Sequence, residues 1–354
     1  MENIKDYTLS ALTDWFAERG QRAFRARQVF QWLYQRRVTD FQEMTDLSRG
    51  LREELAAAFS LGALERAEVR ESSDGSRKYA LRLGDGGLIE TVLMPNNTHH
   101  TVCVSTQVGC AMGCDFCMTA RMGLVRNLSA GEIVQQIVAV AGDVAPGSFV
   151  RNVVFMGMGE PLHNYDNLIA ALEILSDDHG FGFSHRRLTV STVGLVPDIR
   201  RFAREKVRAN LAVSLNAASD EVRTRLMPVN RRWPIAALLE ACREIPAGNR
   251  HRITFEYVLI RGVNDDLADA RRLVKLLHGL KCKVNLIPYN AGPGSDYQPP
   301  APEHARAFQE ALLRRGLLTT LRISKGQDIQ AACGQLITES RPERRSESCG
   351  TAVG

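Results

Sequence analysis

The sequence predicts an α/β protein whose main part is an open, partial (βα)6 barrel, preceded by a small helical domain and a β-hairpin. Two observations predict this class. From about residue 101, strand-like and helix-like segments alternate about six times, and parallel strands need such crossovers. Motifs rich in Cys, Gly, Ser or Asn follow most of these strands, where barrel enzymes place their active sites. About six units are too few for the usual eight-unit closed barrel, so we expect an open one.

Residues 1–66 are expected to form a helical accessory domain. The spacing of apolar residues predicts helices over Thr8–Arg19, Ala23–Arg37 and Leu47–Phe59. The stretch from Arg19 to Arg37 holds six arginines and no acid, which is compatible with RNA binding but is also typical of a solvated helix face. These arginines are Arg19, Arg22, Arg25, Arg27, Arg36 and Arg37.

Residues 67–100 are expected to form a β-hairpin extension. From Lys78 the sequence reads "KYALRL-GDGG-LIETVLMP", in which two alternating runs are joined by a Gly-rich turn. At the other end of the chain, residues 341–354 form a polar tail that we expect to be disordered. Cys349 lies in this tail, and the sequence assigns it no role.

Residues 101–340 are expected to form the barrel. The candidate strands are Thr101–Gln107, Asn152–Met156, Arg187–Ser191, Asn210–Ser214, Arg252–Leu259 and Lys283–Ile287. Helical patterns between them include Ala130–Ala141, Asp166–Leu175 and Asp266–Leu277.

Composition and charge exclude little. Of 354 residues, 44% are hydrophobic and 24% charged, and no apolar run approaches the roughly 18–20 residues that span a bilayer. The first ten residues lack the basic-then-apolar pattern of a secretory signal, so we expect a cytoplasmic chain without a membrane partner. In a reducing compartment, the eight cysteines are better explained as metal ligands, catalytic thiols or core residues than as structural disulfides.

Three cysteines, Cys110, Cys114 and Cys117, follow the first barrel strand in the spacing C-x3-C-x2-C. Structural zinc sites use four protein ligands and paired C-x2-C knuckles, and no second knuckle exists here. The spacing instead suits a [4Fe–4S] cluster that leaves one iron free. A zinc site completed by a distant cysteine or histidine remains the alternative from spacing alone.

The cysteine loop and the "GMGEP" motif (157–161) after the second strand resemble the radical S-adenosylmethionine (SAM) superfamily. The resemblance implies a [4Fe–4S] cluster whose free iron binds the amino and carboxylate groups of SAM. It also implies SAM contacts from other strand ends, each of which has a simpler explanation as a turn or a helix cap. The residues so implied are Gly159, Glu160, Ser191, Ser214, Leu215, Asn216 and, for the adenine edge, Asn290.

Longer stretches resemble the RlmN/Cfr family of radical SAM RNA adenine methyltransferases. They are "CVSTQVGCAMGCDFCMTA", "DIQAACGQL", "RRLTVSTVGLVP", "NLAVSLNA", "NLIPYN" and "GLIETVLMP". The resemblance implies a monomer that methylates 23S rRNA, with tRNA as a further candidate substrate, and that receives electrons from a flavodoxin or ferredoxin. One departure is that "PYN" is followed by "AGPGSDYQPP", where relatives often carry a proline directly after the asparagine.

The resemblance also implies a mechanism. Carbon 2 of adenine is electron-poor and cannot attack the methyl group of SAM. The thiol matching Cys333 therefore takes a methyl from one SAM, and a radical made from a second SAM activates that methyl for addition to the ring. The thiol matching Cys103 then releases the product by forming a disulfide with Cys333, and Glu90 aligns with the base that removes the ring proton. Without the resemblance, Cys103 would be taken for a buried strand cysteine. Cys242 and Cys282 lie in apolar helix and strand patterns, respectively, and are expected to be core residues.

Three alternatives stay open from the sequence. The first is methylation of carbon 8 instead of carbon 2, because the motifs are shared, although "CMTARMG" looks nearer to the carbon-2 members. The second is a radical SAM enzyme acting on a protein or small molecule, and the third is a non-catalytic metal-containing RNA-binding module. The arginine-rich helices and the Cys103/Cys333 pair argue against the second alternative. The third predicts no SAM turnover and four protein ligands for the metal.

Overall fold

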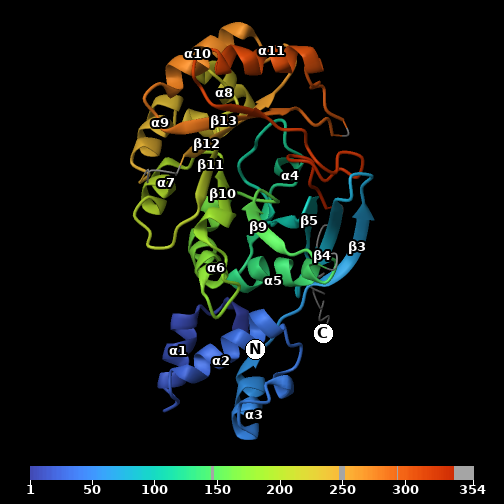
Figure 1. Cartoon of the computed structure of the whole chain (residues 1–354), viewed down its shortest axis with the longest axis vertical. Helices are drawn as coiled ribbons and strands as arrows, with labels where there is room; N and C mark the ends of the chain where they lie inside the picture. The colour runs from blue at the N-terminus through green and yellow to red at the C-terminus, as the bar shows by residue number, and fades with distance from the viewer. Residues whose placement is uncertain (145–146, 247–251, 293, 339–354) are drawn as a thin grey trace, which may run out of the picture.

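The computed structural model describes residues 1–144, 147–246, 252–292 and 294–338. The predicted tail 341–354 and Cys349 lie outside these ranges. Figure 1 shows an elongated molecule in which a helical domain at the N-terminal end lies below a large curved sheet. No helix of the described ranges is long and apolar enough to cross a membrane.

The helical domain forms where the apolar periodicity predicts it. Buried side chains such as Leu12, Phe30 and Leu55 face one another across its helices. Thr8 and Ser48 cap two of the helices by accepting hydrogen bonds from backbone amides of the first turn. The elements are β1 (Glu2–Asn3), η1 (Ile4–Asp6), α1 (Leu9–Ala17), α2 (Phe24–Gln31), η2 (Trp32–Arg36), η3 (Phe41–Glu43), α3 (Arg49–Ala58) and β2 (Phe59–Ser60).

The large sheet has ten strands in the order β14-β13-β12-β11-β10-β9-β6-β5-β4-β3. From β6 to β14 neighbouring strands are parallel, and the two edge strands, β14 and β3, do not pair with each other, so the barrel is open as predicted. The parallel strands are β6 (His99–Cys103), β9 (Val150–Phe155), β10 (Leu188–Thr192), β11 (Asn210–Ser214), β12 (Ile253–Leu259), β13 (Cys282–Pro288) and β14 (Thr319–Leu321).

The predicted hairpin is part of a longer antiparallel section. The strands β4 (Arg77–Arg82) and β5 (Leu88–Asn96) form the hairpin, and β5 pairs in turn with β6, so the extension continues the barrel sheet. The strand β3 (Glu65–Glu71) pairs with β4 but was not predicted. Its sequence, ERAEVRE, is exposed along its whole length and therefore lacks the alternation that marks a half-buried strand.

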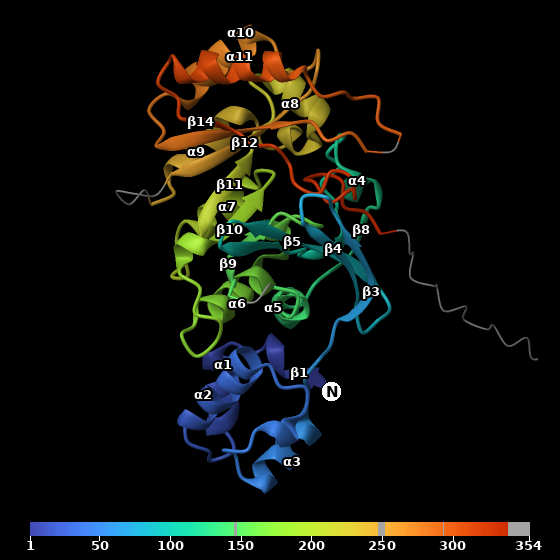
Figure 2. The ribbon, with the colours of Figure 1, turned by 45° about the vertical axis from the view of Figure 1, so that its right-hand side comes forward.

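Helices cover the outer face of the barrel sheet, as Figure 2 shows for α5, α6 and α7. The helix α5 (Ala130–Ala141) begins at a capping box formed by Ser129 and Glu132, and its length equals the predicted one. The other barrel helices are η4 (Pro161–Asn164), α6 (Tyr165–Ser176), η5 (His185–Arg187), α7 (Val196–Phe202), α8 (Asp220–Leu226), η6 (Pro228–Arg231), α9 (Ile235–Arg243), α10 (Leu267–Leu277) and α11 (Pro302–Leu313).

The first barrel strand is shorter than the predicted Thr101–Gln107. Strand β6 ends at Cys103, and Gln107 begins a separate strand, β7 (Gln107–Gly109), which pairs with β8 (Leu124–Asn127). This two-stranded ladder brackets the cysteine loop and the short helix α4 (Met118–Arg121). Gly109 has φ of 75°, and a Cβ there would lie 1.8 Å from the carbonyl oxygen of Gly123, so only glycine fits.

Candidate active site

The cysteine loop is held from three directions by backbone hydrogen bonds. The amide of Cys110 donates to Gly123 O (2.9 Å), that of Asp115 to Leu226 O (3.0 Å) and that of Met118 to Gly334 O (2.7 Å). The loop is thereby fixed between the β7–β8 ladder, the end of α8 and the C-terminal segment. Cys110 and Cys114 are buried and Cys117 is half-buried.

The three thiols of this loop fit an iron–sulfur cluster. Burial raises the pKa of Cys110 to about 12 and that of Cys114 well above its usual range, and neighbouring thiols of the set raise both further. Cationic iron would relieve this cost, since a metal favours thiolates. Within the described chain, no three Cys, His, Asp or Glu side chains converge on one point as ligands of a single ion do. A cluster instead binds its thiolates through separate irons, which this donor set allows.

Glu160 follows β9 and is buried beside the loop. Its carboxylate accepts hydrogen bonds from the amides of Leu162 (3.2 Å) and Val193 (2.9 Å), and its own amide donates to Gln107 Oε1 (2.9 Å). Burial outweighs these bonds and raises the pKa of Glu160 to about 7. A ligand ammonium group would restore the ionised form, because an opposite charge favours it.

Gly159 makes close packing beside Glu160 possible. Its φ is 100°, and an added Cβ would lie 2.6 Å from Cβ of Gln107. The residue thus combines a left-handed backbone with a contact that no side chain tolerates. The "GMGEP" turn is therefore fixed against β7, directly before the cysteine loop.

The predicted SAM contacts at the carboxyl ends of β10 and β11 differ in burial and in hydrogen bonding. Ser191 and Ser214 are half-buried, whereas Leu215 and Asn216 are buried. Asn216 has φ of 55°, and its Oδ1 accepts a hydrogen bond from the amide of Val258 (2.9 Å). Its side chain therefore links β11 to β12, so a ligand contact by Asn216 stays a prediction.

Asn290 is also engaged. Its Nδ2 donates to Ser324 Oγ (3.0 Å) and lies 3.4 Å from the carbonyl oxygen of Cys333, while its Oδ1 accepts from Gln327 Nε2 (3.1 Å). These bonds attach the loop after β13 to the C-terminal segment that carries Cys333. The adenine contact of Asn290 stays a prediction, and its hydrogen bonds give this side chain a structural role as well.

Cys103 and Cys333 line the same small pocket, although they are far apart in the sequence. All seven cysteines of the described ranges are free thiols, so the implied disulfide is absent from this state. Burial raises the pKa of Cys103 to about 12, and nearby Cys333 adds to the shift. Arg322 lines the same pocket, and Cys333 and Cys103 both raise the pKa of its guanidinium.

Glu90 lies on the same face of the sheet as Cys103. Cys103 pairs with Val92 across β5 and β6, and Glu90 is two residues before Val92. Its carboxylate forms a buried ion pair with Lys78 (2.9 Å) and accepts a hydrogen bond from the amide of Ile337 (2.8 Å). Burial raises the pKa of Glu90, and Lys78 partly offsets that rise.

Comparison with known proteins identifies the family. The profile described as "Ribosomal RNA large subunit methyltransferase N-terminal domain" matches residues 2–61, and that of the radical SAM superfamily matches residues 104–274. A dual-specificity RNA methyltransferase RlmN of Syntrophotalea carbinolica is 52% identical, covering 98% of this chain and 93% of that protein. The chain belongs to the RlmN family of radical SAM methyltransferases.

Other RlmN proteins and one solved structure agree with this. The dual-specificity RNA methyltransferase RlmN of Syntrophobacter fumaroxidans is 50% identical, covering 95% of this chain and 98% of its own. The crystal structure of a radical SAM methyltransferase from Sphaerobacter thermophilus aligns with a TM-score of 0.89 and 47% identity, covering 95% of this chain and 99% of its own.

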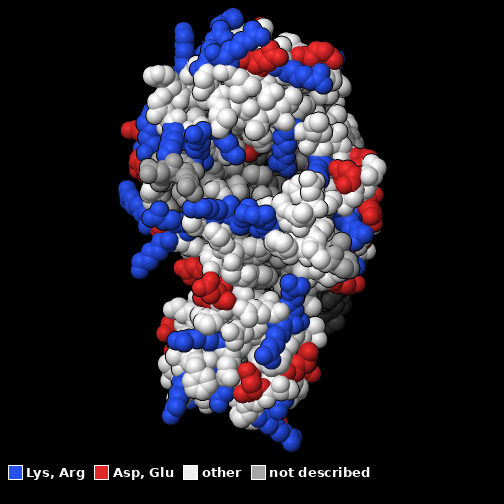
Figure 3. All heavy atoms as spheres, in the orientation of Figure 1, with Lys and Arg blue, Asp and Glu red and all other residues white. Residues whose placement is uncertain are grey.

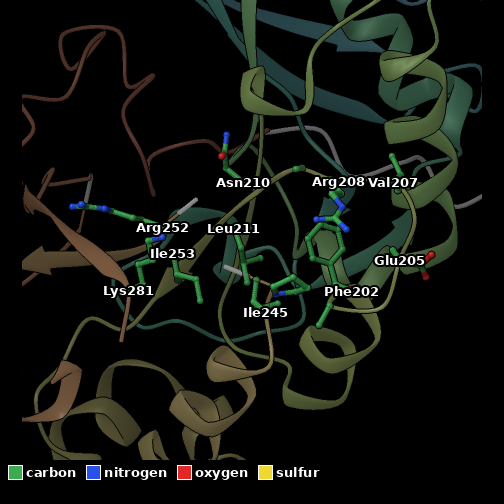
Figure 4. Close-up of a pocket in the computed structure, with 13 residues that line it drawn as sticks. Phe202, Glu205, Val207, Arg208, Asn210, Leu211, Ile245, Arg252, Ile253 and Lys281 are labelled. Atoms are coloured by element: carbon green, nitrogen blue, oxygen red, sulfur yellow. The ribbon is translucent and has the colours of Figure 1, made fainter. Parts of the chain in front are cut away.

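A second pocket lies away from the cysteine loop. Figure 4 shows Asn210 and Leu211 from the start of β11, Ile253 from the start of β12 and Lys281 just before β13 around it. It therefore opens at the amino ends of the parallel strands, whereas the cysteine loop lies at their carboxyl ends.

Figure 3 shows Lys and Arg side chains gathered around a hollow in the upper half of the molecule.

Sequence reasoning missed three charged residues of this site. Lys78 pairs with Glu90, Arg322 lies beside the two thiols, and Arg223 is buried under the strand ends. None belongs to a motif that predicts a role, because a charged residue in a strand or helix is ordinarily exposed. Burial identifies Lys78 and Arg223, whereas the half-buried Arg322 is identified by the pocket that it shares with the two thiols.

Proposed function

We propose that this chain methylates carbon 2 of an adenosine in 23S rRNA, and also in tRNA, with Cys333 as methyl carrier and Cys103 as resolving thiol. Membership of the RlmN family supports RNA as the substrate, since the relatives are called dual-specificity RNA methyltransferases. The observation that carries the residue roles is the shared pocket of Cys103 and Cys333, beside Arg322 and next to the cysteine loop. An electron donor such as flavodoxin or ferredoxin and a monomeric state belong to the same proposal.

The residues of the pocket divide the work. Arg322 places a guanidinium beside Cys333, the sulfur that attacks the methyl group, and the pKa of this guanidinium is raised chiefly by Cys333. Burial raises the pKa of Cys103 to about 12, so this thiol keeps its proton until product release. When bound at the three-cysteine loop, a [4Fe–4S] cluster with SAM supplies the one-electron chemistry that activates an inert methyl group.

Release of the product requires the second thiol. The thiol of Cys103 loses its proton as its sulfur bonds to the sulfur of Cys333. The carbon–sulfur bond to the product breaks, and the product carbon keeps the electron pair and takes up a proton to become a methyl group. Glu90 is the base for the ring proton, and burial raises its pKa, which makes its carboxylate a stronger proton acceptor. The implied disulfide is thus a product state of the cycle, which an external reductant reverses.

The RNA surface is proposed to include α2. Arg22, just before this helix, and Arg27, on it, are exposed, whereas Arg25 is half-buried, with its guanidinium bonded to Gln28 and to the carbonyl of Asp46. The first two are therefore the better candidates for phosphate contacts, because their side chains are free to reach an RNA backbone.

The deciding experiment compares cysteine variants in an anaerobic reaction with isotopically labelled SAM. Cys333→Ala should give neither product nor adduct, and Cys103→Ala should accumulate protein linked to RNA through Cys333, visible as a nuclease-sensitive shift on a denaturing gel. Cys282→Ala is the matched control, because Cys282 is also a strand cysteine and is as little exposed (7%) as Cys103 (7%). Normal turnover without adduct by cluster-loaded Cys103→Ala would refute the roles.

Mass spectrometry of the RNA nucleosides in the same reaction tests the position of methylation. We expect 2-methyladenosine. Finding 8-methyladenosine instead would favour the carbon-8 activity of the wider family, and finding neither with cleaved SAM present would favour a substrate other than RNA.

A further inference from the structure

Arg223 on α8 is one of the largest side chains that are completely buried, with 0% of its surface exposed. Its guanidinium donates four hydrogen bonds, all to neutral acceptors: Leu215 O (3.1 Å), Asn230 Oδ1 (2.8 Å), Val193 O (2.7 Å) and Ser214 O (3.2 Å). A buried cation without a bonded anion is costly. Burial accordingly lowers the pKa of Arg223 to about 10.

The acceptors of Arg223 belong to the strand ends that the family resemblance connects with SAM. Val193 follows β10, Ser214 is the last residue of β11, and Leu215 comes directly after it. One guanidinium therefore fixes two adjacent strand ends at the same edge of the sheet. The planar fork of arginine makes this possible, because its donors point in set directions.

The same helix supports the cysteine loop. Leu226, at the end of α8, accepts the hydrogen bond from the amide of Asp115, and Leu226 and Met227 pack against Cys114. Cys114 and Asp220 both raise the pKa of Arg223 electrostatically. The carboxylate of Asp220 itself accepts hydrogen bonds from Asn230 and from the amide of Ile235. The buried positive charge thus lies close to where three thiolates would carry negative charge.

We propose that Arg223 is a positioning residue for the methylation reaction: its buried charge balances the anionic iron–sulfur centre, and its hydrogen bonds fix the strand ends that bind SAM. This inference rests on the proposed cofactors but not on the identity of the methyl acceptor. A cation near the centre stabilises the state that has gained an electron, so Arg223 raises the reduction potential, which depends on net charge and hydrogen bonding. No bond forms or breaks at Arg223 itself.

The test uses the full chain, anaerobically loaded with iron and sulfide, without RNA. Arg223→Gln should shift the midpoint potential, followed by EPR, to more negative values and weaken SAM binding by about tenfold or more, since a bond from a charged donor contributes about 1.5–3 kcal/mol. Arg223→Lys keeps the charge but not the fork, so the potential should stay near that of the unaltered protein while SAM binding weakens. Arg225→Gln removes an exposed charge two residues along the same helix and should change neither quantity.

Two outcomes would overturn the inference. One is that Arg223→Gln, fully loaded with the cluster, has the same midpoint reduction potential as Arg225→Gln. Arg223 would then have a purely structural role. The other is unchanged SAM affinity in Arg223→Lys, which also decides the matter if the Gln variant does not fold. Because neither measurement involves RNA, failure of the methyl-acceptor assignment would appear only in the nucleoside analysis.

Discussion

Replacing Lys78 by Met should destabilise the protein in a way that depends on pH. Lys78 and Glu90 form an ion pair at 2.9 Å, and only 5% and 6% of their side chains are exposed. At this distance the attraction is about 6 kcal/mol for an effective dielectric constant of about 20. Without Lys78, the carboxylate of Glu90 would be a buried charge bonded only to the amide of Ile337.

The loss is limited because Glu90 can bind a proton instead. Its ordinary pKa is 4.5, and each pH unit above that value costs about 1.4 kcal/mol for protonation. The expected destabilisation of Lys78→Met is therefore about 4 kcal/mol at pH 7.5 and about 1 kcal/mol at pH 5. The sign follows from linkage: the folded variant holds a proton that the unfolded chain has released, so its stability falls as pH rises above 4.5.

Urea unfolding of the metal-free chain at the two pH values measures this difference. Adding Glu90→Gln to Lys78→Met removes the charge and should abolish most of the pH dependence. Arg49→Met is the control for an exposed ion pair, since Arg49 (83% exposed) and Glu53 (57%) form one on α3, and it should cost under about 1 kcal/mol. A loss for Lys78→Met that is equal at both pH values would refute the reasoning.

Three further predictions concern other parts of the site. Burial raises the pKa of Glu160 to about 7, so the contribution of this group to stability is lost as pH rises from 4.5 through 7. In urea titrations of the metal-free chain, the free energy of unfolding of Glu160→Gln should therefore rise by about 3 kcal/mol over that range, relative to the unaltered chain. A difference that stays constant with pH would contradict this. Gly159→Ala should lower the melting temperature and the SAM affinity more than Gly86→Ala does. Gly86 also has a positive φ (84°), but no atom lies within 4 Å of a Cβ added there. Equal effects of the two substitutions would exclude the clash with Gln107 as the cause. Replacing Arg22 and Arg27 by Gln should lower the salt dependence of RNA binding by about one unit of slope per lost phosphate contact, and an unchanged slope would return both to a solvated surface.

The sequence alone predicted most strands and helices of the barrel and the loop whose three cysteines we expect to hold the cluster. Helix α5 and strand β11 have the predicted bounds, because each carries its own pattern of apolar residues and turn residues. The three cysteines needed no long-range information, since their spacing within one loop already limits the metal they suit. Strand β3 was missed because it buries nothing and so carries no pattern.

Only the tertiary structure decided which polar groups are free and which are already bonded. Asn216 looks like a ligand residue in the sequence, yet its amide bonds to the next strand. Arg223 looks like a surface arginine but is fully buried, and Lys78 looks like an exposed strand residue but forms a buried ion pair. The proximity of Cys103 and Cys333 came from a family resemblance and not from any local pattern. The physical reason is that burial and hydrogen-bond partners depend on segments that come together only in the folded chain, and no local periodicity in the sequence indicates which segments those are.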